Sequence, residues 1–178
     1  MLLLIQYTLI FSSVLLLVAL GGCFSEHSGV INLGLEGIMV IGALGGALIM
    51  RFMPASTPAF VMVVAVILGA VLFGVIYSCL LGVACINLKA DQTIVGTAMN
   101  MLGTAAATVL VKAMNTASNP DDVSSTIQYA EAKKCVLVNI GGFEVNWFML
   151  VAVVALVVAY VTLYIINLIV NLNLYSTK

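Results

Sequence analysis

Residues 59–88 have the sequence AFVMVVAVILGAVLFGVIYSCLLGVACINL, in which no side chain carries a charge. An α-helix rises about 1.5 Å per residue, so a segment of this length crosses the roughly 30 Å hydrocarbon core of a membrane with some tilt. Pro54 and Pro58 precede it, and proline is poorly tolerated inside a helix. The segment therefore predicts a long transmembrane helix that begins at Ala59.

The composition of the whole chain leads to the same conclusion. Of its 178 residues, 63% are hydrophobic and 7% are charged, and the mean hydropathy is +1.25. A soluble domain carries about 25% charged residues, and the few charges of this chain cannot cover a water-exposed surface. The composition excludes a soluble enzyme, a disordered tail and a nucleic-acid-binding protein, which needs a basic face. We expect membrane lipid to be its main solvent.

Other charge-poor segments predict the remaining membrane spans. With the first segment, they cover residues 1–24, 30–50, 59–88, 93–112 and 146–166. We therefore expect an all-α, polytopic transmembrane bundle of about five helices, with residues 1–166 as one membrane-spanning domain. Residues 115–144 are expected to form an extramembrane loop, and the Asn-rich residues 167–178 an atypical C-terminal tail.

A polar segment, SEHSGVINLGLEG at residues 25–37, interrupts the apolar runs. If residues 32–36 are helical, Asn32 and Glu36 share one helix face. A carboxylate at the centre of a membrane helix costs about 2.5–3.5 kcal/mol, so Glu36 must face a polar cavity, pair, or lie near the interface. Gly29, Gly34 and Gly37 would let neighbouring backbones approach. Two interpretations remain open: part of a translocation path or its gate, or a structural carboxylate that bonds another helix.

A second polar group opens the segment at residues 93–112. Asp91 and Gln92 suit the first turn of a helix, and we expect Asp91 to cap it rather than to line a path. Asn100 lies within the segment, where a buried amide needs a partner from a helix, water or a solute. Asn100 is therefore a candidate for lining a path. The small residues of Gly42-x-x-x-Gly46 predict a face for helix packing.

Nothing in the sequence predicts bond chemistry. The chain contains no paired carboxylates, no Walker motif and no Cys-x-x-Cys spacing, and His27 is its only histidine. The four cysteines are expected to behave as small hydrophobic residues. We therefore expect neither an enzyme nor a metal or cofactor site in this chain, and an ATPase for any energised transport must be another subunit.

Two motifs carry a family resemblance. Residues 21–39, GGCFSEHSGVINLGLEGIM, resemble a signature of bacterial ABC-importer permeases of the nucleoside and simple-sugar type, within the branched-chain amino-acid permease superfamily. Residues 90–102, ADQTIVGTAMNML, are similar to a second segment of that family. The resemblance covers about residues 15–164. One departure is His27, where the family usually has arginine.

The resemblance implies a multi-pass subunit of the bacterial cytoplasmic (inner) membrane that moves a nucleoside-like, simple-sugar or related small polar solute. It implies three partners, namely a second permease chain, a cytoplasmic ABC ATPase that uses the ATP, and an extracytoplasmic solute-binding (lipo)protein. By this resemblance the substrate-path candidates are Asn32, Glu36 and Asn100. The gate or motif candidates are Ser25, Glu26, Gly29, Gly34, Gly37, Asp91 and Gln92.

The C-terminal residues depart from the family pattern. Family members continue after the fifth span into a basic Arg- and Gly-rich segment that docks on the ATPase, whereas the residues after Tyr164 lack this pattern. We therefore expect an incomplete, N-terminal half of a permease without the docking segment. The alternative is a non-transporting membrane scaffold or assembly protein; an intramembrane enzyme is disfavoured because no catalytic set is present.

Overall fold

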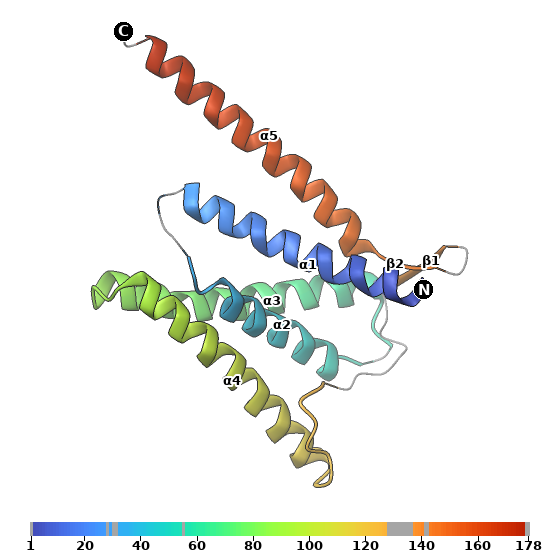
Figure 1. The fold of residues 1–178 in the computed structure, drawn as a ribbon. Coiled ribbons are helices and arrows are strands. Elements are labelled where there is room, and N and C mark those ends of the chain that lie inside the picture. Colours follow the sequence, from blue (N-terminus) through green and yellow to red (C-terminus); the bar gives the residue numbers. More distant parts are fainter. Residues whose placement is uncertain are drawn as a thin grey trace. The chain divides into compact units, whose positions relative to one another are not determined.

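A computed structural model describes residues 2–27, 29, 32–54, 56–127, 137–140 and 143–176. The elements in chain order are α1 (Leu2–His27), α2 (Leu35–Phe52), α3 (Ala59–Gly82), η1 (Val83–Asn87), α4 (Gln92–Ser118), β1 (Leu137–Ile140), β2 (Phe143–Asn146) and α5 (Trp147–Ser176), as Figure 1 shows. The chain divides into two compact units, residues 24–135 and residues 1–23 with 136–178.

The prolines determine where α3 begins, as predicted. Pro58 is extended, with φ −54° and ψ 140°, and its carbonyl accepts the N–H of Met62 at 3.0 Å. The helix continues through the wider turn of η1, in which the N–H of Leu88 reaches back to the carbonyl of Val83 at 3.2 Å. Lys89 follows with a φ of 54°, in the left-handed region, which ends the helix.

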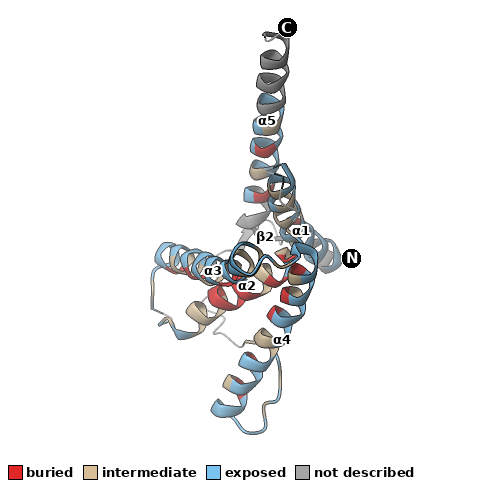
Figure 2. Ribbon diagram, turned by 90° about the vertical axis from the view of Figure 1, so that its left-hand side faces the viewer, coloured by how far each residue is buried: buried red, intermediate tan, exposed pale blue. Residues whose placement is uncertain are grey.

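The core of the unit formed by residues 24–135 lies around α2, which packs against both α3 and α4 (Figure 1). Buried residues concentrate on α2 (Figure 2), including Gly42, Gly45 and Gly46. A Cβ atom at Gly45 would lie 2.5 Å from Cγ of Phe73, and one at Gly42 would lie 3.2 Å from the carbonyl oxygen of Ala70. The prediction that Gly42-x-x-x-Gly46 forms a packing face is confirmed.

The expected all-α membrane fold is confirmed. Among the described residues, four helical segments are long and apolar enough to cross a membrane: Tyr7–His27, Leu35–Phe52, Ala59–Asn87 and Gln92–Ser118. Among the same residues, Val151–Ile165 of α5 form a shorter apolar helical segment. Large apolar side chains face outward, as with Phe60, which is 80% exposed. Such an outer surface suits lipid rather than water.

In the other unit, the described part contains a short hairpin that the sequence did not predict. Strands β1 and β2 pair antiparallel, with Leu137 opposite Asn146 and Ile140 opposite Phe143. The paired strands begin inside the predicted loop 115–144 and end two residues beyond it, at Asn146, directly before α5. Residues 128–136 of that loop lie outside the described residues.

Several helix bounds differ from those expected. Helix α1 continues to His27, α4 runs six residues beyond Lys112 to Ser118, and α5 continues to Ser176 through most of the predicted tail. Charge marks where lipid ends, but the backbone hydrogen bonds of a helix can continue into water past that point. Helix α2 begins late, at Leu35, because polar groups before it form a turn.

Candidate functional site

The start of α4 is set by Asp91. One oxygen of its carboxylate accepts the N–H of Thr93 at 2.8 Å and that of Ile94 at 3.3 Å. These two hydrogen bonds hold the pKa of the Asp91 carboxyl below its usual value, the bond from Ile94 contributing most. Asp91 is thus an N-cap, as predicted. Gln92 is the first residue of α4 and is exposed.

Asn100, about two and a half turns further along α4, connects that helix to the start of α2. Its side-chain oxygen accepts the N–H of Gly37 at 2.8 Å, and its side-chain nitrogen donates to the carbonyl of Leu33 at 2.7 Å. The N-cap of α2 is Gly34, which has no side chain to bond the free N–H groups of the first turn. Asn100 therefore caps α2 from the neighbouring helix.

The backbones of α2 and α4 approach closely where Asn100 bonds the start of α2, and this contact forms a joint between the two helices. A Cβ atom at Gly37 would lie 2.7 Å from the carbonyl oxygen of Met99, and one at Gly103 would lie 3.0 Å from the Cα atom of Gly37. Gly96 is equally constrained, since a Cβ there would lie 3.0 Å from the backbone nitrogen of Gly34. Only glycine fits such contacts, so these positions set the depth at which α2 docks on α4.

Helix α3 contributes Tyr77 to the same joint. Its buried hydroxyl donates a 2.7 Å hydrogen bond to the carbonyl of Met99. The sequence analysis missed Tyr77, Gly96 and Gly103. A usable signal for Tyr77 was present, because a phenol within a charge-free membrane span needs a hydrogen-bond partner.

Asn32 does not share a helix face with Glu36, contrary to the arrangement expected for a helical segment 32–36. Residues 32–34 precede α2. The side-chain oxygen of Asn32 accepts the N–H of Gly34 at 3.1 Å, which stabilises a turn. Asparagine competes in this way for backbone groups that a helix would use.

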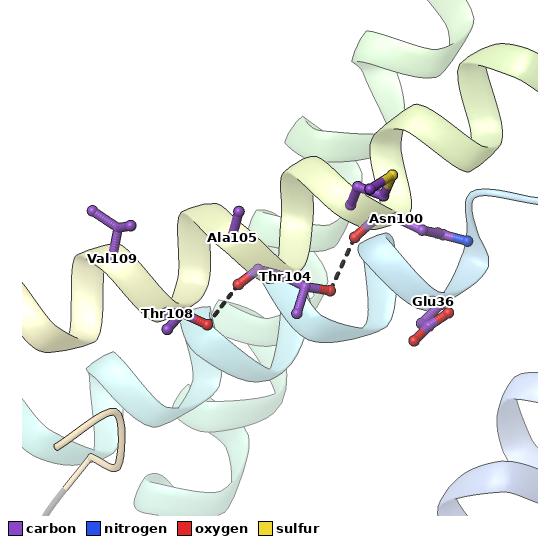
Figure 3. A pocket seen from close by; sticks show the side chains of 7 residues that line it. Glu36, Asn100, Thr104, Ala105, Thr108 and Val109 are labelled. Atoms are coloured by element: carbon purple, nitrogen blue, oxygen red, sulfur yellow. Dashed lines mark hydrogen bonds between the residues drawn. The ribbon is translucent and has the colours of Figure 1, made fainter.

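Glu36 lies in the first turn of α2, at an open groove of about 530 Å³. The groove is lined by Glu36, Asn100, Met101, Thr104, Ala105, Thr108 and Val109, as Figure 3 shows for six labelled residues. Within the part of the chain that the structure describes, the Glu36 carboxylate makes no hydrogen bond or ion pair. Its charge is exposed at the groove, and the amide of Asn100 makes the interhelical bonds instead.

Two threonines give the groove a polar wall along α4. The hydroxyl of Thr104 donates to the carbonyl of Asn100 at 2.9 Å, and that of Thr108 donates to the carbonyl of Thr104 at 2.8 Å (Figure 3). Each hydroxyl is satisfied within its own helix and still has lone pairs that can accept a hydrogen bond. The groove thus combines a carboxylate with neutral acceptors on an apolar floor.

The remaining predicted residues lie elsewhere. Ser25 and Glu26 belong to the last turn of α1. Gly29 has a φ of +83°, and its N–H bonds the carbonyl of Glu26 at 3.0 Å, which closes that helix with a glycine in the left-handed region. The predicted segment 25–37 therefore splits into a turn that ends α1 and a joint, around Gly34 and Gly37, that docks on α4.

A second polar joint connects the other ends of α2 and α4. Arg51 bonds the side-chain oxygens of Asn115 and Ser118. The amide nitrogen of Asn115 donates to the carbonyls of Ser124 and Thr126. The sequence analysis placed Asn115 in a loop and assigned it no role, although a lone arginine at the end of an apolar span was a signal that a partner exists.

Comparison with known proteins extends these observations. Residues 4–167 match the family described as branched-chain amino acid transport system / permease component. The chain is 43% identical over 109 residues to the guanosine ABC transporter permease protein of Bacillus subtilis, covering 59% of this chain and 33% of that protein. It is 36% identical over 104 residues to the nucleoside ABC transporter permease protein of Lactococcus lactis, covering 58% and 32%.

A third similar protein is named for a sugar. The putative glucose ABC transporter permease protein of Haloferax volcanii is 40% identical over 99 residues, covering 52% of this chain and 26% of that protein. The matched part of this chain thus spans about a third of the length of these curated relatives. No solved structure matches the chain.

Proposed function

Since the chain belongs to the family of branched-chain amino acid transport system / permease components, we propose that it is a transmembrane permease subunit of an ABC-type importer. The proposed solute is nucleoside-like, a simple sugar or a related small polar molecule. Relatives are named as permeases for guanosine and nucleosides and, putatively, for glucose. The chain is a multi-pass inner-membrane protein with four described helical segments long and apolar enough to cross a bilayer.

One observation carries the proposal. The two family-like segments, residues 21–39 and 90–102, are far apart in the sequence, yet Gly37 and Asn100 are hydrogen-bonded to each other at 2.8 Å. The joint brings Glu36 and the polar wall of α4 to one groove. A carboxylate and hydroxyl groups at a groove on otherwise apolar helices support a path for a polar solute.

Within this proposal the candidate residues take different roles. Glu36 and the hydroxyls of Thr104 and Thr108 line the path. Asn32 and Asn100 support the path by holding the start of α2, because their side chains bond the backbone there. The family and the named relatives are transport permeases, which supports a role in transport rather than in bond chemistry.

The proposed partners follow from the same assignment. A cytoplasmic ABC ATPase would bind and hydrolyse the ATP, so this chain itself would hold no cofactor or metal. A second permease chain would complete the membrane part, and an extracytoplasmic solute-binding protein would deliver the solute. These partners are proposed from the family and from the printed names of its relatives.

Uptake measurements test the proposal. The coding sequence is deleted in its own host and restored from a plasmid, and uptake of radiolabelled guanosine and glucose is measured. We expect loss of uptake of at least one of them on deletion and its return on complementation. Uptake of an unrelated amino acid is the control for membrane energisation. Full uptake of both solutes without the chain would contradict the proposal and favour the scaffold role.

A charge-neutral variant tests the path itself. Glu36→Gln keeps the shape of the side chain and removes its charge, so we expect lower uptake at an unchanged amount of protein. Asp121→Asn is the matched control, because Asp121 is an exposed acid beyond the end of α4. If Glu36→Gln and Asp121→Asn leave uptake equally intact, Glu36 is not part of the path.

A further inference from the structure

Both polar atoms of the Asn100 side chain have a protein partner. Its oxygen bonds Gly37 at 2.8 Å and its nitrogen bonds Leu33 at 2.7 Å. Both partners belong to backbone that a helix cannot satisfy by itself: the N–H of Gly37 lies in the first turn of α2, and Leu33 precedes that helix. Losing the Asn100 side chain would therefore remove the protein partner of both groups.

Glu36 lies between these two attachment points. Leu33 and Gly37 lie on either side of it in the sequence, and both bond the same amide. Any rotation of the first turn of α2 about its axis would break one or both bonds. There is little room for translation toward α4, since even a Cβ atom added at Gly37 would lie 2.7 Å from the carbonyl oxygen of Met99, and one added at Gly103 would lie 3.0 Å from the Cα atom of Gly37. The direction in which the Cα–Cβ bond of Glu36 leaves the helix toward the groove is thereby fixed.

We propose that Asn100 is a positioning residue for the path: it acts through Glu36 by fixing the first turn of α2, and not by contacting the solute. This inference rests on the proposed function of the chain as a permease subunit. It separates two residues that line one groove (Figure 3) into one that faces the solute and one that orients it.

A double-mutant cycle distinguishes positioning from direct contact. Uptake KM and maximal rate are measured for Glu36→Gln, Asn100→Ala and the double variant, in cells with the full set of partner subunits and normalised to the amount of chain in the membrane. We expect Asn100→Ala to lower the uptake rate about tenfold, the range of a lost hydrogen-bonding group, and Glu36→Gln to lower it at least as much. The double variant should be no worse than Glu36→Gln alone, because Asn100 has nothing left to position.

Asn115→Ala provides the matched control. Asn115 is also an amide on α4 that bonds α2, but it does so at the Arg51 end, away from Glu36. Its effect should multiply with that of Glu36→Gln, as independent effects do. Asn100→Asp is the conservative variant: it keeps the acceptor for Gly37 and loses the donor to Leu33, so its uptake should lie between wild type and Asn100→Ala. It replaces Asn100→Ala in the cycle if that variant does not accumulate.

The outcomes separate the inference from the function on which it rests. Multiplicative losses for Asn100 and Glu36 overturn the inference and leave the permease function standing. An unchanged rate in Glu36→Gln also overturns it, since Asn100 would then have no target. If the wild-type chain supports no uptake, the proposed function fails and the inference fails with it.

Discussion

Arg51 and Asn115 join one end of α2 to α4 through a 2.8 Å hydrogen bond, as Asn100 and Gly37 join the other end. The Asn115 side chain is only 3% exposed and also bonds the loop that follows α4. Helix α2 is therefore attached to α4 by polar hydrogen bonds near each end. The stability of this unit should depend on both attachments.

Replacing Arg51 with alanine should destabilise the α2–α4 pair. The change removes two charge-assisted hydrogen bonds and leaves Asn115 short of a partner, so we expect a loss of about 1.5–3 kcal/mol. Arg51→Lys should lose less, because an ammonium group keeps the charge but not the planar fork of donors. Thermal unfolding in detergent micelles measures the difference. Lys112→Ala, at an exposed position of α4, is the control, and an equal effect of both alanine variants would contradict the prediction.

A methyl group at Gly37 should loosen the joint. The Cβ atom of Gly37→Ala would lie 2.7 Å from the carbonyl oxygen of Met99, a backbone atom that cannot move without shifting α4. We expect a loss of about 1–3 kcal/mol from this overpacking. Gly82→Ala is the control, since nothing lies within 4 Å of its Cβ position and alanine favours a helix. Equal unfolding temperatures for the two variants would show that the contact carries no energy.

Removing the hydroxyl of Tyr77 should cost stability while the ring packing is kept. Tyr77→Phe loses the 2.7 Å bond to Met99 and leaves no new polar group on the ring. The expected loss is about 0.5–1.5 kcal/mol, measured by thermal unfolding in detergent. Tyr7→Phe, at a position that is 54% exposed, should change nothing. A Tyr77→Phe variant as stable as Tyr7→Phe would mean that the bond to Met99 does not stabilise the joint.

The cap at Asp91 should make stability depend on pH in the acidic range. The Asp91 pKa is lower in the folded chain, because Ile94 and Thr93 bond the charged form. Its contribution is therefore fully present above the ordinary aspartate pKa of about 3.9 and is lost as pH falls through the lower, folded value. Unfolding temperatures of wild type and Asp91→Asn, measured between about pH 7 and 3, should converge at the acidic end.

The pKa of Asp122 is also lowered in the folded chain, so the comparison for Asp91 must hold Asp122 constant. Hydrogen bonds from Ser124, and then the charge of Arg51, lower the Asp122 pKa. Because both variants compared for Asp91 retain Asp122, its contribution cancels in their difference. A constant difference between wild type and Asp91→Asn across the whole pH range would contradict a cap that works through the ionised carboxylate.

The predictable parts of this fold follow from short-range rules. Pro58 predicted the start of α3, because its ring restricts the backbone. Asp91 predicted the start of α4, because its carboxylate bonds the next N–H groups. Gly42 and Gly46 indicated a packing face because small residues allow close helix contact. Each of these rules needs only the neighbouring residues, so the local sequence was sufficient.

For the joint between α2 and α4, the sequence predicted one partner of the hydrogen bond but not the other. The sequence marked Asn100 as an amide that needs a partner, but the partner was backbone 63 residues away, at Gly37. Asn32 and Glu36 would share a helix face only if residues 32–36 were helical, and they do not, because Asn32 forms a turn before α2. The role of Arg51 and Asn115 stayed hidden for the same reason as the Asn100 bond: two residues 64 apart meet only when helices pack.

Apolar composition and charge spacing along the chain were enough to place this protein in a membrane as a set of helices, because lipid leaves backbone groups no other way to be satisfied. The family motifs pointed to Glu36 and Asn100 as candidates. Only the packing of α2 on α4 distinguishes them, because it leaves the Glu36 carboxylate exposed at a groove and bonds the amide of Asn100 to the backbone of Leu33 and Gly37. Hydrogen bonds between distant residues depend on how the helices dock, and docking is a property of three-dimensional shape rather than of local sequence.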